Sequence, residues 1–321
     1  MVPLWEPPAG PLPEQLKEQH KERPGKSGLR PRILIALWRA ARVALHLAQG
    51  IVIATQRMPG WSNPQRNVWI QHWSATLLRI LAIRLHVSGA PPDSTAPLMI
   101  VANHISWIDV HVLNAICPAR FVAKSEIRRW PLIGHLARQA GTVFIERARQ
   151  RDILRVNRAL AALMRAGAAS AVFPEGTTTE GGTVLPFRPA LLQAAINCGA
   201  RLQPVALGYR HADGRWCSQA GFTGDTSFIT SLWRVLSQAQ IHAHLQFLPA
   251  AACSGQQRKI LARNARQQIQ SALAQPAGCR PDCPTCAAAT ALRQTSTQPA
   301  APATGRRPLV GAVISRMPGF R

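Results

Sequence analysis

Residues 98–109 read Leu-Met-Ile-Val-Ala-Asn-His-Ile-Ser-Trp-Ile-Asp. The five apolar residues at the start predict a buried strand, and the residues after them predict a loop that leads into a helix. His104 and Asp109 lie five positions apart, and on a regular helix this interval separates two side chains by about 140°. The two can therefore act as a base and its orienting carboxylate only if the chain turns between them. An ordinary surface histidine near a helix N-terminus explains the same residues equally well.

Short apolar runs alternate with helical patterns after the Pro91-Pro92 pair, which predicts an α/β domain. The predicted strands are 98–102, 121–123, 142–145, 170–173, 202–207 and 241–248. One predicted helix begins at residue 108, and the others span 132–138, 151–165, 190–198 and 254–275. We therefore expect an α/β fold over residues 89–275, with a central mixed sheet flanked by helices.

A long apolar segment, residues 33–54, precedes this domain and is interrupted by Arg39, Arg42 and His46. These three residues share one helical face, opposite a surface of Leu, Ile and Val. A spanning helix would bury the basic stripe in hydrocarbon at a cost of several kcal/mol, whereas a helix lying in the interface keeps it at the headgroups. The segment is therefore predicted to lie along the membrane surface.

A second helix is predicted at 68–87, where Trp and Arg border an apolar body, as is typical of the headgroup boundary. The two helices predict an N-terminal membrane-associating helical hairpin, residues 31–88, that binds an anionic membrane surface. The alternative is a pair of amphipathic helices packed on a soluble core.

The chain has 321 residues, 47% of them hydrophobic, which is enough for a large core. It carries 38 Lys and Arg against 14 Asp and Glu, a formal net charge of +24. A surface this basic indicates an anionic partner, either nucleic acid or a membrane. Proteins that stack on bases display many aromatic side chains, but the chain has one Tyr, and five of its nine Trp precede Ser88 in or beside apolar segments. The composition favours a membrane over nucleic acid.

The seven Cys are odd in number, which argues against a disulfide framework and favours a reducing, cytoplasmic setting. Residues 1–30 lack a secretory signal and are predicted to be a flexible basic and polar arm. Residues 276–321 are predicted to be a disordered basic tail. Cys279, Cys283 and Cys286 lie in this tail with no fourth ligand nearby, so we expect incidental thiols and no metal site.

Two basic residues follow predicted strands, Lys124 after 121–123 and Arg147 after 142–145. Because strand ends on one edge of an α/β sheet converge on a common crevice, both could face the same space as His104. Arg147 can bind a phosphate bidentately, and Lys124 would add a point charge. For either residue alone, a solvated cation just past a strand is the simpler interpretation.

A polar loop follows the strand 170–173 and contains Glu175, Gly176 and Thr177. A strand that runs into Pro, an acid, glycine and several hydroxyls makes a tight loop whose backbone amides can reach a ligand. Glu175 is then a positioned carboxylate that either holds an acceptor hydroxyl or fixes the loop.

These stretches resemble, in order, four motifs of the glycerolipid acyltransferases, the family that includes the lysophosphatidic acid acyltransferases. His104, four residues and then Asp109 resembles the first motif, 141–147 the second, 173–177 the third and 203–207 the fourth. Thr178 and Thr179 stand where the third motif commonly continues with Arg and Ser, which removes an anion contact. In this respect the chain is closer to bacterial lyso-ornithine-lipid acyltransferases.

The resemblance implies a membrane-associated enzyme that transfers an acyl chain from a thioester to the free hydroxyl of a lysophospholipid. His104 would be the general base, Asp109 its orienting carboxylate, Lys124 and Arg147 the ligands of the acceptor phosphate, and the Glu175 loop a wall of the acceptor pocket. The first acceptor it implies is 1-acylglycerol-3-phosphate, which gives phosphatidic acid, and the alternative is a lyso-ornithine lipid. The acyl donor would be acyl carrier protein or coenzyme A, with no cofactor, at the cytoplasmic face of the inner membrane.

Two other classes of function remain at this point. The charge of +24 also suits a nucleic-acid-binding protein, which would bind DNA with a steep dependence on salt. A membrane scaffold that keeps the fold without the activity is the other class. The presence of both His104 and Asp109 counts against the scaffold.

Overall fold

The computed structural model describes residues 29–92, 97–146, 150–224 and 226–274, all within one compact unit, Met1–Ala277. Arg147 lies outside the described residues, as do the predicted tail and Cys279, Cys283 and Cys286. The predicted arm lies outside them except at its last two residues.

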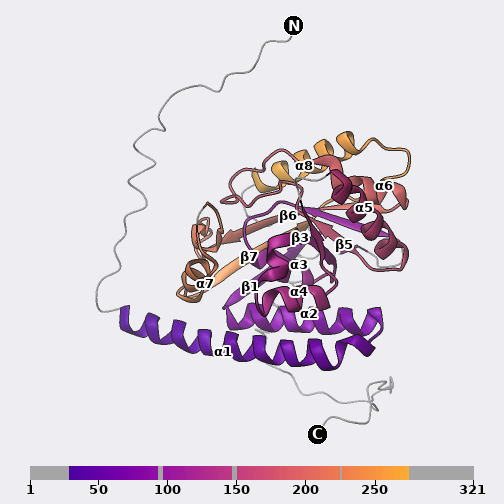
Figure 1. Cartoon of the computed structure of the whole chain (residues 1–321). Helices are drawn as coiled ribbons and strands as arrows, with labels where there is room; N and C mark the ends of the chain where they lie inside the picture. The colour runs from indigo at the N-terminus through magenta and orange to yellow at the C-terminus, as the bar shows by residue number, and fades with distance from the viewer. Residues whose placement is uncertain (1–28, 93–96, 147–149, 225, 275–321) are drawn as a thin grey trace, which may run out of the picture. The chain divides into compact units, whose positions relative to one another are not determined.

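The described residues form an eight-stranded mixed sheet in the order β1-β7-β6-β2-β5-β3-β4, with β8 paired to β6 (Figure 1). The strands are β1 Ile83–Ser88, β2 Leu98–Ala102, β3 Arg120–Lys124, β4 Val143–Ile145, β5 Ser170–Val172, β6 Arg201–Arg210, β7 Ile241–Phe247 and β8 Ala251–Ala252. Strand pairs are parallel except that β6 is antiparallel to β7 and β8. Every residue of β2 is buried, as expected for a central strand that is covered on both faces.

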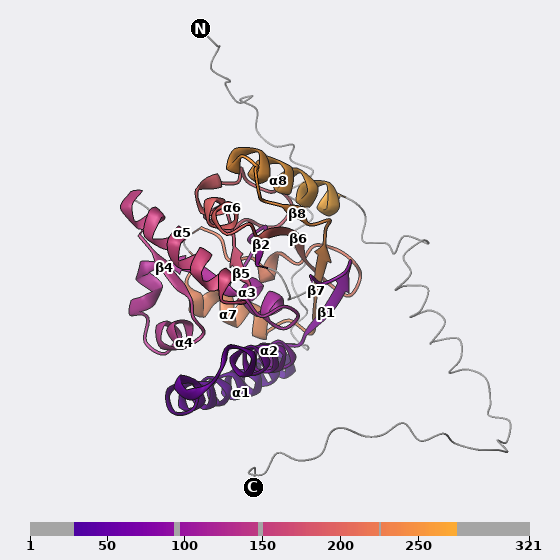
Figure 2. The same ribbon diagram turned by 90° about the vertical axis from the view of Figure 1, so that its right-hand side faces the viewer.

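Helices cover both faces of the sheet, with α1, α2, α3 and α7 packed on one face and α5, α6 and α8 on the other (Figure 2). The helices are α1 Leu29–Gln56, α2 Asn63–Ile80, α3 Ile108–Asn114, α4 Ile133–Gln139, α5 Gln150–Arg165, α6 Gln193–Asn197, α7 Phe228–Leu236 and α8 Arg258–Ala274. Short 3-10 helices span Met58–Gly60, Ser125–Arg129, Pro189–Leu192 and Ser218–Ala220. The prediction of a mixed α/β fold with flanking helices is confirmed.

The second N-terminal helix is shorter than predicted. It ends at Ile80, and Ile83–Ser88 form β1, which pairs in parallel with β7 at the edge of the sheet. Apolar and polar residues alternate along this segment, which is the period of a strand with one face on the core. The prediction of a helix through residue 87 is therefore wrong. Strand β8 and helix α7 were not predicted.

The basic stripe of α1 consists of Arg39, Arg42 and His46. A helix lying among the lipid headgroups would point all three side chains away from the protein, and the structure does not show this. The guanidinium group of Arg39 donates to three backbone carbonyls at 2.5–3.2 Å. They belong to Leu236, the last residue of α7, and to Gln238 and Ala239 in the loop that follows. His46 is buried, stacks on Trp73 at 4.6 Å and lies 3.0 Å from the Trp73 carbonyl oxygen. Of the three basic residues, Arg42 alone is exposed. The orientation predicted for the stripe is wrong for Arg39 and His46.

The outward face of α1 is apolar instead. Its exposed large apolar side chains are Ile33, Leu34, Ile35, Leu37, Trp38, Leu45 and Val52. Among the described residues, no helix combines the length and the hydropathy needed to cross a membrane. Arg39 and His46 bond inside the protein, and large apolar side chains of α1 face outward.

Candidate active site

The turn between β2 and α3 brings His104 and Asp109 together. His104 Nδ1 lies 2.8 Å from Asp109 Oδ2, and the backbone N–H groups of Ile105 and Ser106 donate to the same oxygen at 2.7 and 2.9 Å. The carboxylate therefore holds the turn around itself, as the five-residue interval required. Since a carboxylate only accepts hydrogen bonds, this geometry places the imidazole hydrogen on Nδ1 and leaves a lone pair on Nε2.

Asp109 is fully buried and has a further partner that the sequence did not single out. The hydroxyl of Tyr209, near the end of β6, donates to Asp109 Oδ1 at 2.6 Å. Burial, and then the charge of Asp109, raise the pKa of the Tyr209 phenol well above its usual value, so it stays a donor at physiological pH. Tyr209 is the one tyrosine of the chain and lies one residue before the end of β6, which pairs with β2, and this was the available signal.

Replacing Tyr209 by phenylalanine removes this donor and keeps the buried ring. We expect kcat/KM for acyl transfer to fall by roughly tenfold, the loss typical of one hydrogen bond to a charged group. Initial rates of acyl transfer at varied acceptor concentration measure this effect. An unchanged kcat/KM would contradict a role of Tyr209 through Asp109.

Asn103 fixes the chain just before the turn. Its side-chain amide donates to the Leu207 carbonyl at 2.9 Å and accepts from the Leu207 N–H at 2.8 Å. Because β2 ends at Ala102, paired with Val205 of β6, this fully buried amide extends the pairing by one more step. The backbone is therefore fixed at the point where it leaves the sheet, one residue before His104.

The imidazole of His104 is held on its face as well as at Nδ1. It stacks on the ring of Phe173 at 4.1 Å, and that ring stacks on Phe121 at 5.8 Å. The side chain of His104 remains 21% exposed. The ring is therefore oriented by protein contacts and still accessible, as a general base must be.

Glu175 fixes the backbone next to the dyad. Its Oε1 accepts the His104 N–H at 2.7 Å, and its Oε2 accepts the Leu185 N–H at 2.9 Å. Burial raises the pKa of the Glu175 carboxyl, and these two N–H groups oppose that shift. Glu175 was expected either to hold an acceptor hydroxyl or to fix its loop, and these contacts match the second role. Gly176 has a φ of 76°, which favours glycine, and Thr177 is exposed on the same loop.

A family model described as Acyltransferase matches residues 84–208. A lyso-ornithine lipid O-acyltransferase of Pseudomonas aeruginosa is 38% identical over 243 residues, which cover 74% of this chain and 93% of that protein. The chain belongs to the acyltransferase family. A 1-acyl-sn-glycerol-3-phosphate acyltransferase of Neisseria meningitidis serogroup B is 35% identical over 219 residues, which cover 68% of this acyltransferase and 86% of its relative.

The fold of this acyltransferase also matches a solved structure. The 1-acyl-sn-glycerophosphate acyltransferase PlsC of Thermotoga maritima aligns with a TM-score of 0.58 over 76% of this chain and 95% of that chain, at 19% identity. At that identity the likeness concerns the fold alone.

The structure brings some of the predicted site residues of the acyltransferase together and leaves others apart. His104, Asp109 and Glu175 are linked by hydrogen bonds. Lys124 is exposed at the end of β3, two strands from β2 and on the same edge, about 10 Å across the sheet. Strand β4 ends at Ile145 on that edge, and Arg147, two positions later in the sequence, lies outside the described residues. The roles of Lys124 and Arg147 therefore remain predictions.

Proposed function

We propose that the protein is a membrane-associated O-acyltransferase that transfers a fatty acyl chain from an acyl thioester to the free hydroxyl of a lysolipid. The observation that carries the proposal is the accessible His104 ring, whose Nδ1 is held by a buried, three times hydrogen-bonded oxygen of Asp109. Membership of the acyltransferase family supports the same reaction class.

The proposed step is direct transfer. Nε2 of His104 takes the proton of the acceptor hydroxyl, whose oxygen attacks the thioester carbonyl. The carbon–sulfur bond breaks, and the imidazolium returns the proton to the departing thiolate. No covalent enzyme intermediate and no cofactor is needed. A general base supplies about 10²- to 10⁴-fold of the rate, and positioning of both substrates supplies more.

For the acceptor we propose 1-acylglycerol-3-phosphate, with Lys124 and Arg147 near its phosphate and the Glu175 loop along the acceptor pocket. The Neisseria relative is named for that substrate. A lyso-ornithine lipid is the second candidate, supported by the name of the Pseudomonas relative and by Thr178 and Thr179 in place of an Arg-Ser continuation. Purified protein assayed with both lysolipids, each with acyl carrier protein and coenzyme A thioesters, separates the two acceptors and the two donors.

Substitution of Arg147 by alanine tests the acceptor. The apparent KM for 1-acylglycerol-3-phosphate should rise by about tenfold or more, since one charge-assisted contact to the phosphate is lost. The KM for a zwitterionic lyso-ornithine lipid should change much less. Arg158→Ala, which removes an exposed arginine of α5, is the matched control. Equal effects of Arg147→Ala on both acceptors would contradict phosphate binding by Arg147.

Membrane association is proposed to rest on the outward apolar face of α1 together with the net charge of +24. Each leucine-sized side chain that enters the acyl region contributes about 1.5–3 kcal/mol. The basic surface adds attraction to anionic lipids. A protein with an exposed apolar helix face and a basic surface lies on the membrane without spanning it. We place this protein at the cytoplasmic face of the inner membrane.

Two leucines on this face test the membrane surface. Leu34 and Leu45 are 67% and 72% exposed, so replacing both by glutamine should leave the fold intact. Partition onto vesicles of phosphatidylcholine with phosphatidylglycerol should fall at least about tenfold. Leu154→Gln, a 56% exposed leucine of α5 on the opposite face of the sheet, should have little effect. Equal sedimentation of all variants would refute the assignment of α1.

A further inference from the structure

Three exposed apolar side chains outside α1 lie at the edge of the sheet where β2 ends, before His104. Strand β3 runs parallel to β5 and β2 and ends on the same edge. From there the chain continues through a short 3-10 helix to Trp130 and Leu132, which are 40% and 55% exposed. Ile229, near the start of α7, is 77% exposed. We call Trp130, Leu132 and Ile229 the edge patch.

Aromatic contacts connect the edge patch to the catalytic turn. The ring of Trp107, three residues after His104, lies edge-on to the ring of Phe228 with centroids 5.2 Å apart. The Phe228 ring lies edge-on to that of Trp130 at 6.0 Å. Trp107 Nε1 also donates to Ser231 Oγ at 3.1 Å, which fixes α7 beside the turn. Packed rings therefore hold the edge patch next to the turn that carries His104.

The exposed position of Leu132 is held by the backbone. The Trp130 N–H donates to the Ile127 carbonyl at 3.1 Å, and the Trp130 and Leu132 carbonyls accept from Gly134 and Leu136 at 2.9 Å. Leu132 itself has a φ of 65°, a conformation that a leucine rarely adopts. Such a conformation persists only where the surrounding structure imposes it, and it is found mostly at functional positions. The fold therefore presents this leucine to the outside on a fixed turn.

The apolar surface of α1 continues to Leu132. Helix α4 lies against the second half of α1, where His135 Nε2 is 2.9 Å from Thr55 Oγ1. His135 follows Leu132 by three positions, and Thr55 follows Val52 by three, so each pair is separated by about one helical turn. Val52 is 52% exposed. Exposed apolar side chains thus lie on both sides of the contact between the two helices.

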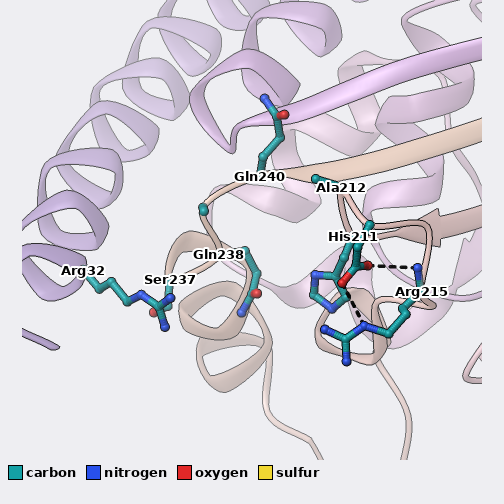
Figure 3. Close-up of a pocket in the computed structure, with 9 residues that line it drawn as sticks. Arg32, His211, Ala212, Arg215, Ser237, Gln238 and Gln240 are labelled. Carbon is teal, nitrogen blue, oxygen red and sulfur yellow. Dashed lines mark hydrogen bonds and ion pairs between the residues drawn. The ribbon is translucent and has the colours of Figure 1, made fainter. Parts of the chain in front are cut away.

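Helix α7 connects the edge patch to the first half of α1. Ile229 and Trp233 are four residues apart on one face of α7, and Trp233 is 41% exposed. The last carbonyl of α7 accepts from Arg39 of α1 at 3.0 Å. Figure 3 shows Ser237, directly after α7, lining one hollow with Arg32 of α1. The exposed stripe of α7 therefore runs from α1 to the edge patch.

The composition around the edge patch indicates the partner that covers it. Arg128 and Arg129 directly precede Trp130, and both are exposed. Cations beside exposed Trp and Leu side chains are typical of the headgroup level of a membrane. A contiguous exposed apolar surface marks an interaction site, and this one continues the face of α1 that is proposed to contact lipid. A lipid bilayer is therefore the partner that fits it.

We propose that the edge patch is a second membrane contact, which holds the catalytic edge of the sheet against the bilayer. The proposal rests on the membrane association and the reaction put forward under the proposed function. Helix α1 supplies attachment, and the edge patch supplies orientation. A lysolipid whose acyl chain stays in the bilayer then brings its hydroxyl to His104 without leaving the membrane.

Leu132→Gln tests the edge patch, with Leu154→Gln as its matched control. The two leucines are 55% and 56% exposed, and Leu154 lies on α5, on the opposite face of the sheet. Acyl transfer is measured to a long-chain lysolipid in vesicles of phosphatidylcholine with phosphatidylglycerol, and to a short-chain lysolipid below its micellar concentration. The ratio of the first rate to the second should fall by roughly tenfold in Leu132→Gln, since one leucine-sized side chain no longer enters the acyl region. Leu154→Gln should keep the wild-type ratio. Ile229→Gln should lower the ratio as Leu132→Gln does, and it leaves the turn at Leu132 untouched.

Tryptophan fluorescence gives a second readout that needs no acyl transfer. Brominated phosphatidylcholine in the vesicles quenches the tryptophans that enter the acyl region. The quenched fraction should fall in Trp130→Phe. It should not fall in the matched control Trp216→Phe, because Trp216 is 38% exposed and lies against Gly208 of β6, on the side of α8.

Equal rate ratios in Leu132→Gln and Leu154→Gln, or a wild-type ratio in Ile229→Gln, would overturn the edge patch. So would a quenched fraction that Trp130→Phe leaves unchanged. If wild-type protein binds no vesicles, the membrane association fails, and the edge patch fails with it. If it binds vesicles but transfers no acyl chain to either lysolipid, the proposed reaction fails, and the quenching still decides the edge patch.

Discussion

Replacing His104 by alanine is expected to lower kcat for acyl transfer by at least about 10²- to 10⁴-fold, the contribution of a general base. The ring is the one group of the dyad that reaches solvent, and its loss leaves Asp109 with three of its four hydrogen-bond donors. Circular dichroism and vesicle binding should therefore match wild type. Steady-state transfer to a lysolipid acceptor measures the effect.

His72→Ala is the matched control, since His72 is an exposed histidine of α2 outside the dyad. It should keep wild-type kcat. Full activity of His104→Ala would remove the proposed mechanism, because no other described side chain is hydrogen-bonded to Asp109 as an accessible base.

Asp109→Asn is expected to lower kcat by up to about 10⁴-fold, as loss of the carboxylate does in other base–carboxylate pairs. The amide oxygen can still accept from His104 and from the turn, while its NH₂ group can donate to Tyr209. The geometry is then kept, but the charge that stabilises the imidazolium is lost. Because Asp109 is fully buried, the weaker hydrogen bonds should also lower the free energy of unfolding by about 1–3 kcal/mol.

Thermal melting and kcat measured together distinguish this variant from His104→Ala, which should lose activity without a comparable loss of stability. Tyr209→Phe provides the intermediate case, with the charge kept and one donor removed. An Asp109→Asn enzyme with wild-type kcat would show that the carboxylate does not act on His104.

Most strands of the domain could be predicted from the local pattern of apolar and polar residues. Strand β2 was predicted with its observed bounds, and each of the other predicted strands is present within a few residues. The turn at His104 followed from the five-residue interval. These features depend on side-chain period and chain geometry over a short stretch, which the sequence contains in full.

The errors concern features that depend on distant partners. Residues 83–88 fit both a helix end and a strand, and the parallel register with β7, 158 residues later, decides for a strand. Tyr209 is 100 positions from Asp109, so its hydrogen bond could not be predicted from spacing. The direction of Arg39 was likewise set by carbonyls almost 200 residues away.

By itself the sequence determined the α/β domain, the pairing of His104 with Asp109 and the amphipathic character of the N-terminal helices, because each is encoded by nearby residues. The tertiary structure alone decided which face of α1 looks outward and how the Asp109 carboxylate is held. Each of these is set by buried polar groups that take their hydrogen-bond partners from remote segments, since an unpaired polar group in the interior costs about 1–3 kcal/mol.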